Sequence, residues 1–322
     1  MGERNMKSLN YLRFIKFTAV ILPLLLSTAV VSVGQKVTRS EAEVTILVTA
    51  MPHDDKSRAV AGRLESSDFA VFENKQKQKI VSVKNADDSP IVFAVLVQDN
   101  LIGGVNNQLP EIRDFIRGLP KGSKAIVGYV GTGSLQVRQN FTTDLNKAAD
   151  SLRIVTGSPF SEPYSPYLHV VDALKLFTNQ PSDERRMLLL ISDGLDDTFG
   201  FRLSSPLYSV YLDNAVRTAQ HNRVAVFTIY ASSTTTRRRS RMAYNYGQGS
   251  LLRLSDETGG QALFSGIDFV SFDPYFREYR NLLKDQWLIT YESATTGKGF
   301  RRIDVQTDFD IDLQFPDGYY PD

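Results

Sequence analysis

Two stretches of the chain are almost continuously apolar, and each ends next to an aspartate. Residues 91–98 precede Asp99, and residues 187–192 precede Asp193. Apolar runs of this length are typical of central strands in a sheet that is covered on both faces. Residues at the carboxyl ends of such strands line the crevice in which open α/β sheets bind ligands. We therefore expect both aspartates at a ligand-binding edge.

Between residues 90 and 283, strand patterns alternate with helical ones. In the segments between the apolar runs, apolar side chains recur every three or four positions, which is the spacing of one helix face. Strands are expected at 91–98, 125–130, 187–192, 224–230 and 262–264, and helices around 109–119, 144–154, 165–177, 208–219 and 251–258. This alternation predicts an α/β domain with a doubly wound, mostly parallel sheet and helices on both faces.

Both ends of this domain are flanked by strand patterns. Segment 41–88 reads as short strands separated by polar turns, with no amphipathic helix between them, and segment 286–322 returns to the same character. We expect the two segments to pair in one small β subdomain.

The first 34 residues have the layout of a secretory signal peptide. A basic flank precedes an uncharged, mostly apolar stretch at 17–33, and small residues at 32–34 offer a cleavage site. The alternative is an uncleaved membrane anchor, because the stretch is near the lower length limit for crossing a bilayer. Either interpretation predicts export to the periplasm, the cell envelope or the exterior.

Composition narrows the chemistry. The chain of 322 residues has a net charge of +1, which gives no reason to expect a nucleic-acid partner, and it contains no cysteine and three scattered histidines. No nucleophile elbow or paired-carboxylate motif is present, and the glycines at 131 and 133 are typical of a hairpin turn, so we expect no enzymatic activity. One biased segment, 232–250, is expected to be an exposed loop and carries four basic residues: Arg237, Arg238, Arg239 and Arg241.

Three further patterns carry a family resemblance. Residues 67–74 read SDFAVFEN and are followed by QKI at 78–80; residues 191–197 read ISDGLDD; the tail holds FRRIDV at 300–305 and GYY at 318–320. Together they resemble the von Willebrand factor A domain, and more narrowly the secreted proteins related to it that are abundant in acidobacteria. The resemblance covers residues 41–322 and implies a Rossmann-like fold.

The family resemblance also implies a metal-ion-dependent adhesion site, in which Asp, Ser and Thr oxygens surround Mg²⁺ at about 2.1 Å. The first motif of that site, Asp-x-Ser-x-Ser, aligns with Asp99, but Leu101 and Gly103 stand at the two Ser positions, and Leu168 stands at the Thr position. The site is therefore expected to be degenerate. Asp99 and Asp193 remain as candidate ligands of Mg²⁺ or another divalent cation. The alternative is that Asp99 caps the next helix and Asp193 binds backbone N–H groups in its turn.

The sequence thus predicts a secreted, non-enzymatic binding protein with no cofactor and a protein or cell-envelope partner. A membrane is expected as a partner only through an uncleaved N-terminal segment. Two alternatives stay open: a metal-dependent adhesin with a reduced cation site, and a structural envelope protein with a vestigial one. Candidate partner-binding residues are Asn100, Ser165, Asp196, Arg237, Arg238, Arg239 and Arg241.

Overall fold

The computed structural model describes residues 42–321 except 88, 182, 201–203, 235–240 and 265–269. The predicted signal peptide or anchor at 1–34 lies outside the described residues. Among the described residues, no helix combines the length and the apolarity that crossing a bilayer requires.

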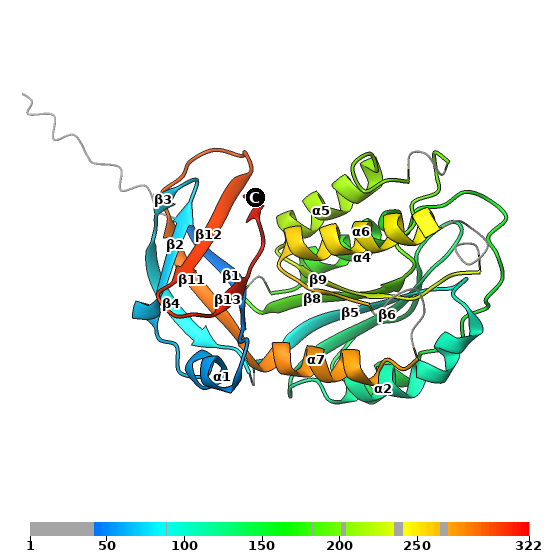
Figure 1. Cartoon of the computed structure of the whole chain (residues 1–322), viewed down its shortest axis with the longest axis horizontal. Helices are drawn as coiled ribbons and strands as arrows, with labels where there is room; N and C mark the ends of the chain where they lie inside the picture. Colours follow the sequence, from blue (N-terminus) through cyan, green and yellow to red (C-terminus); the bar gives the residue numbers. More distant parts are fainter. Residues whose placement is uncertain are drawn as a thin grey trace, which may run out of the picture. The chain divides into compact units, whose positions relative to one another are not determined.

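A six-stranded sheet forms the centre of the α/β domain (Figure 1). Its order is β10-β9-β8-β5-β6-β7, in which only the edge strand β7 runs antiparallel to its neighbour. The strands are β5 (Ile91–Gln98), β6 (Lys124–Val130), β7 (Gln136–Thr142), β8 (Arg185–Ser192), β9 (Ala225–Tyr230) and β10 (Ala262–Leu263). The predicted fold class, a doubly wound and mostly parallel sheet, is confirmed.

Helices cover both faces of this sheet, which explains why its central strands β5 and β8 are buried at every position (Figure 1). Alternate residues of β5 pack against α2 (Leu109–Arg117), α3 (Leu145–Asp150) and α7 (Asp273–Lys284) on one face. The others pack on the opposite face against α4 (Pro166–Lys175), α5 (Val210–Asn222) and α6 (Arg241–Thr258). Short 3₁₀ turns lie at Ser66–Asp68, Gly103–Gln108 and Leu176–Asn179.

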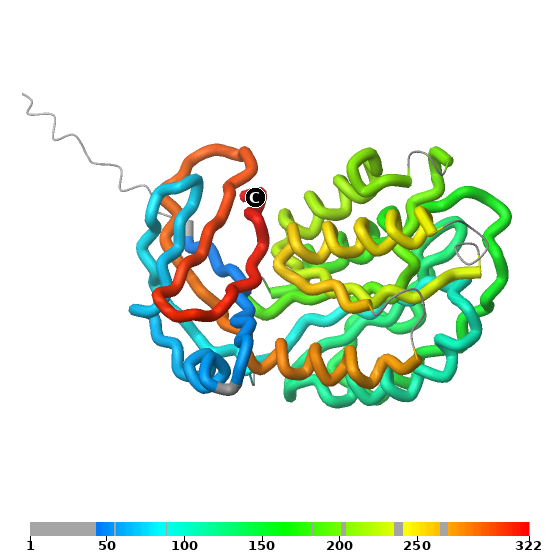
Figure 2. Tube along the Cα trace, in the orientation of Figure 1, coloured from blue at the N-terminus to red at the C-terminus, as the bar shows by residue number. Residues whose placement is uncertain are grey.

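The flanking β subdomain is built from both ends of the chain, as predicted (Figure 2). One sheet has the order β13-β1-β11-β4 and the other β14-β12-β2-β3. The N-terminal strands are β1 (Ala42–Met51), β2 (Phe69–Glu73), β3 (Gln76–Lys77) and β4 (Lys79–Asn85); the C-terminal ones are β11 (Gln286–Ser293), β12 (Arg301–Thr307), β13 (Asp312–Gln314) and β14 (Gly318–Tyr319). Strand β1 pairs with β11, and β2 pairs with β12.

Two expectations for local structure were wrong. A short helix, α1 (Asp55–Ala61), lies where only turns were expected, because Asp54 accepts a hydrogen bond from the Ser57 N–H and forms a capping box. Residues 241–250, expected within an exposed loop, form the first part of α6, whose buried side packs on β9 and α5. Tertiary packing there outweighs a local composition rich in Gly, Tyr and Asn.

A buried polar network ties the two ends of the chain together inside the β subdomain. The Glu73 carboxylate is fully buried and accepts hydrogen bonds of 2.9 Å from the hydroxyls of Tyr291, Ser293 and Tyr319. The Arg301 guanidinium donates to the last two hydroxyls, at 2.8 and 2.9 Å. Two hydroxyls thus bridge the buried negative and positive charges.

Candidate functional site

The strand order of the central sheet reverses between β5 and β8. From β5 the chain moves outward through β6 and β7, whereas from β8 it moves to the other side through β9 and β10. Such a switch point is where open α/β sheets form a binding crevice. Asp99 follows β5 and Asp193 follows β8, so the two candidate ligands lie at the ends of adjacent strands.

Gln98 joins the two strand ends. Its buried Oε1 accepts hydrogen bonds from the Ser192 hydroxyl (2.5 Å) and from the Asp193 N–H (3.1 Å). Its Nε2 donates to Asn100 Oδ1 at 2.6 Å. The Gln98 side chain, at the end of β5, therefore fixes the positions of the loop that follows β5 and of the loop that follows β8.

Asp99 is paired with an arginine of the same chain. Arg153 Nη1 lies 2.6 Å from Asp99 Oδ1, and Arg153 Nη2 lies 3.2 Å from Asp99 Oδ2, so the contact is bidentate. The Thr156 N–H adds a bond of 3.1 Å to Asp99 Oδ1. This geometry contradicts the interpretation that Asp99 caps the following helix.

Arg153 is itself held from several sides. Its guanidinium lies 4.1 Å from the centre of the Tyr129 ring, and it donates to Gln136 Oε1 and to the Ile154 carbonyl. The hydrogen bonds to Asp99 raise the pKa of the Arg153 guanidinium above its ordinary value. The cation beside Asp99 is thus a fixed, permanently charged part of the chain.

The residues at this edge do not fit the oxygen shell that Mg²⁺ requires. Leu101 is completely buried and Leu168 is an exposed residue of α4, so neither position offers an oxygen from its side chain. Both oxygens of Asp99 already contact Arg153. Within the part of the chain that the structure describes, no group of three or more His, Cys, Asp or Glu side chains is arranged to hold a metal ion.

Asp193 lies in a tight turn that two helices hold in place. Its Oδ1 accepts a hydrogen bond of 3.1 Å from the Leu195 N–H, as the alternative interpretation of this residue predicted. The Tyr167 hydroxyl of α4 donates to the Gly194 carbonyl at 2.6 Å, and Gly247 of α6 packs directly against this turn. Burial, and then the charges of nearby carboxylates such as Asp193, raises the pKa of Tyr167 well above its ordinary value.

The partner-binding candidates lie in different environments. Asn100 and Asp196 are buried, and Asp196 accepts hydrogen bonds from the Thr198 N–H and from the Ser209 hydroxyl at the start of α5. Ser165 occupies the N-cap position of α4, but its buried hydroxyl makes no cap bond. Arg241 is the exposed first residue of α6. Three further candidates lie outside the described residues: Arg237, Arg238 and Arg239.

A pocket of about 210 Å³ opens at this edge next to Asp193. Its walls come from residues 160–164, which precede α4, and from the loop after β8, which also supplies Asp197. The Asp197 N–H donates to the Tyr164 carbonyl at 3.0 Å and thereby links the two walls. The pocket is large enough for one side chain of a partner.

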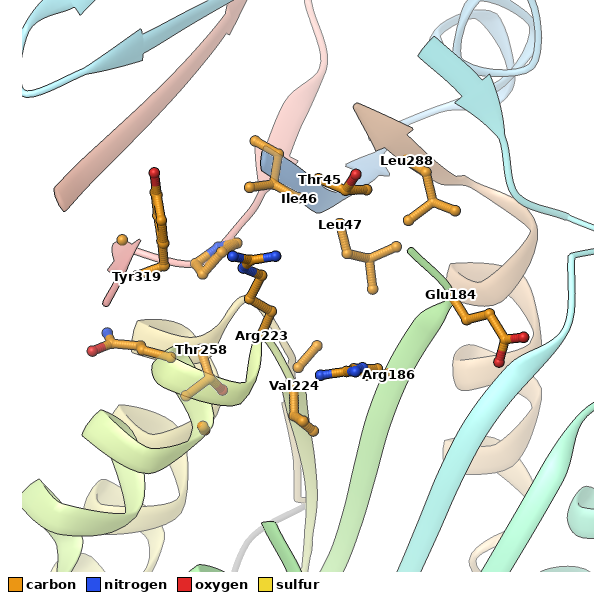
Figure 3. A pocket seen from close by; sticks show the side chains of 15 residues that line it. Thr45, Ile46, Leu47, Glu184, Arg186, Arg223, Val224, Thr258, Leu288 and Tyr319 are labelled. Atoms are coloured by element: carbon orange, nitrogen blue, oxygen red, sulfur yellow. The ribbon is translucent and has the colours of Figure 1, made fainter. Parts of the chain in front are cut away.

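A second pocket lies at the opposite, amino ends of the strands (Figure 3). Residues of β1, β8, α5 and β14 line it, including Leu47, Arg186 and Tyr319, together with Arg223, which directly follows α5. Its volume is about 30 Å³, which is room for a water molecule but not for a ligand. The carboxyl edge is therefore the better candidate site.

Sequence reasoning did not find Gln98 and Arg153. Gln98 could have been noticed in the sequence, because it is the one polar residue of an otherwise apolar strand and directly precedes the candidate ligand Asp99. Arg153 had none: it lies 54 positions after Asp99, in a segment expected to be the end of a helix. The helix α3 instead ends at Asp150, which frees residues 151–157 to reach the strand ends.

The Arg153–Asp99 pair is expected to stabilise the fold measurably. In a double-mutant cycle of Asp99→Asn and Arg153→Gln, we expect a coupling free energy of about 1–2 kcal/mol, because the contact is bidentate and mostly shielded from water. Urea unfolding of the wild type, both single variants and the double variant measures it. The exposed i,i+3 pair of Asp172 with Lys175 is the control and should couple by less than about 0.5 kcal/mol.

No protein-family model matches the sequence, and a search of curated proteins gives no match. Many solved structures are similar to this chain, among them the following three. The conserved hypothetical protein BatB from Bacteroides thetaiotaomicron is 13% identical with a TM-score of 0.38, covering 61% of this chain and 97% of that one. A von Willebrand factor type A protein from Catenulispora acidiphila is 9% identical with a TM-score of 0.42, covering 86% and 72%. The SpRpn10 VWA domain is 13% identical with a TM-score of 0.35, covering 61% and 93%.

Proposed function

We propose that this chain is a binding protein of von Willebrand factor A type whose carboxyl edge contacts a protein or cell-envelope partner without a metal ion. The observation that carries this proposal is the ion pair between Arg153 and Asp99. The Arg153 guanidinium supplies, from within the chain, the positive charge that a divalent cation supplies in the metal-ion-dependent adhesion site of the family. The strand order and the switch point between β5 and β8 support binding at this edge.

The narrower family membership is supported by where its motif residues lie. Glu73 comes from the VFEN pattern, Arg301 from FRRIDV and Tyr319 from GYY, and all three belong to one buried network. Because patterns far apart in the sequence meet in one place, they behave as parts of one β subdomain. Export is inferred from the basic and apolar segment at 1–34. A non-enzymatic role is inferred from the sequence, which carries no recognisable catalytic motif.

Thermal unfolding of the full chain in chelator and in about 5 mM Mg²⁺ or Mn²⁺ tests the metal-free interpretation. We expect no rise in the midpoint, because the oxygens of Asp99 are engaged and the neutral ligands are lacking. A cation that bound the folded state at 100 times its Kd would add about 2.7 kcal/mol of stability, which is readily measured.

The same experiment on Asp99→Ala and on the exposed Asp308→Ala separates a specific response from a general one. A rise in the wild type and in Asp308→Ala that disappears in Asp99→Ala would overturn the proposal in favour of a metal-dependent adhesin. A rise in all three proteins would be a general ion effect that leaves the proposal standing.

A further inference from the structure

A basic pocket lies where the end of α5 meets the C-terminal tail (Figure 1). Its volume is about 440 Å³, and six residues line it: Arg217, Thr218, His221, Lys298, Tyr320 and Pro321. The Asn222 carbonyl at the end of α5 accepts a hydrogen bond from Arg186 near the start of β8. The basic pocket therefore lies toward the amino edge of the central sheet, away from the carboxyl edge that holds Asp99 and Asp193.

Positive charge in the basic pocket is not compensated by the protein. Arg217 and His221 lie one helical turn apart on the exposed side of α5, and Lys298 comes from the turn between β11 and β12. None of these three side chains makes a hydrogen bond or an ion pair with a described residue, and no described acidic residue lines the pocket. By contrast, the exposed Arg117 and Lys175 each pair with an aspartate. Because the whole chain has a net charge of only +1, this excess of positive charge is a local feature.

The buried network of the β subdomain holds one wall of the basic pocket in place. Arg301, which belongs to that network, donates a hydrogen bond of 3.1 Å to the Gly297 carbonyl and so fixes the turn that carries Lys298. The Tyr320 ring packs against Phe300, with ring centroids 5.2 Å apart. A site whose walls are fixed before binding loses little conformational freedom when a ligand enters.

The charged groups of the basic pocket match a phosphate monoester. A guanidinium presents parallel N–H donors that fit two oxygens of a phosphate, and an ammonium adds a compact positive charge. Arg217 and Lys298 together carry two positive charges at pH 7, and a phosphate monoester carries about 1.5 to 2 negative charges, whereas a carboxylate carries only one. The His221 imidazole offers a ring nitrogen for a further hydrogen bond.

The basic pocket has more room than a phosphate group needs. Its volume of about 440 Å³ is in the usual range for small-molecule sites, so the organic group that carries the phosphate fits as well. The rings of Tyr320 and Pro321 supply apolar surface against which a sugar ring or an alkyl chain packs.

From these observations we propose that the basic pocket binds a phosphate monoester. Arg217, His221 and Lys298 surround the phosphate, and Tyr320 and Pro321 contact the organic group that carries it. This site goes beyond the proposed function, because it gives the chain a second ligand at the edge of the sheet opposite to the Arg153–Asp99 pair.

Titration of the ¹⁵N-labelled full chain at pH 7 tests the proposal, with chemical-shift changes as the readout. The probes are glucose 1-phosphate, inorganic phosphate, glucuronate, which carries a single carboxylate, and uncharged glucose. We expect glucose 1-phosphate to bind at least about fivefold more tightly than glucuronate and about threefold more tightly than inorganic phosphate, and glucose to cause no shift up to about 10 mM. The affinity for glucose 1-phosphate should fall as salt rises from about 20 to 200 mM.

Variants locate the site and separate its parts. Arg217→Gln and Lys298→Gln are each expected to weaken binding of glucose 1-phosphate about fivefold. Lys147→Gln removes the same charge from an exposed position of α3, on the other face of the central sheet, and should leave binding unchanged. Tyr320→Ala should weaken binding of glucose 1-phosphate but not of inorganic phosphate, because it removes only the wall that contacts the sugar.

Vesicles of phosphatidylcholine with about 20% phosphatidic acid identify the source of the phosphate. Vesicle binding that is lost in Arg217→Gln assigns the phosphate to a lipid, and binding of glucose 1-phosphate alone assigns it to a soluble molecule or a polymer. Three results contradict the proposal: glucuronate binds as tightly as glucose 1-phosphate, no phosphate ester binds, or Lys147→Gln loses as much affinity as Arg217→Gln. Because none of them involves the carboxyl edge, the metal-free binding function stands or falls separately.

Discussion

Glu73→Ala is expected to destabilise the β subdomain by about 3 kcal/mol or more. The substitution leaves the Arg301 guanidinium without its buried counter-charge and removes the acceptor of the Tyr291, Ser293 and Tyr319 hydroxyls. Breaking a buried charge pair by removing one partner typically costs about 3–5 kcal/mol, because the other charge remains buried. Trp287 offers a local reporter: it is the only tryptophan, it is buried in β11, and it packs against Phe69. Urea unfolding followed by its fluorescence measures the loss.

The charge of Glu73 also predicts a pH dependence. Burial raises the pKa of Glu73, but hydrogen bonds from Thr295, Ser293, Tyr319 and Tyr291 outweigh burial and hold it below its ordinary value of 4.5. Because the folded pKa is lowered, the ionised network stabilises the fold above about pH 4.5, and this contribution is lost as the pH falls through the folded pKa. The stability difference between wild type and Glu73→Gln should therefore narrow in acid.

Two comparisons keep this expectation testable. Glu43→Gln, at an exposed position of the neighbouring β1, should change stability by less than about 0.5 kcal/mol. Far-UV circular dichroism, which is dominated by the helices of the α/β domain, shows whether that domain unfolds together with Trp287. A Glu73→Ala variant as stable as Glu43→Gln would show that the network does not hold the chain ends together.

The sequence was sufficient to predict the fold class, because the apolar strands and the helices that alternate with them are long and several of them carry the same information. Residues 91–97 of β5 and 187–191 of β8 are apolar at every position, which is typical of strands in a sheet covered on both faces. The alternation of strand and helix then left few topologies. The sequence pattern was a weaker guide to short helices and helix ends, where only a few residues determine the local structure. The polar residues at 52–55 were interpreted as a turn, although Asp54 starts α1 with a capping box. The biased composition of 232–250 was interpreted as an exposed loop, although α6 begins at Arg241.

The candidate site was predictable only in part. Position at the end of a strand identified Asp99 and Asp193, because topology alone brings such residues to one edge. The partner of Asp99 could not be predicted, since Arg153 reaches it through an irregular segment whose path depends on packing against Tyr129. The network of Glu73 shows the opposite case: its motifs were visible in the sequence, but only the folded strands show what they do together.

Gly247→Ala is expected to destabilise the α/β domain by about 3 kcal/mol or more and to displace the Asp193 turn. A Cβ atom at position 247 would lie 2.0 Å from the carbonyl oxygen of Asp193, and one at Gly194 would lie 2.4 Å from the carbonyl oxygen of Gly247. Each clash is with backbone, so no side chain can rotate away to relieve it. Overpacking in a core typically costs about 1–3 kcal/mol even where side chains can adjust.

Gly249→Ala, two residues further along the same helix, is the matched control. Its added Cβ would meet only the Pro206 side chain, at 3.1 Å, and alanine is favoured over glycine in a helix interior by about 1 kcal/mol. The two alanine variants gain the same helix propensity, so the difference in their stability isolates the contact with the Asp193 turn. Urea unfolding followed by far-UV circular dichroism measures this difference. Equal stability of the two variants would mean that α6 can move away from β8 without cost. In that case α6 would not be what holds Asp193 at the edge of the pocket.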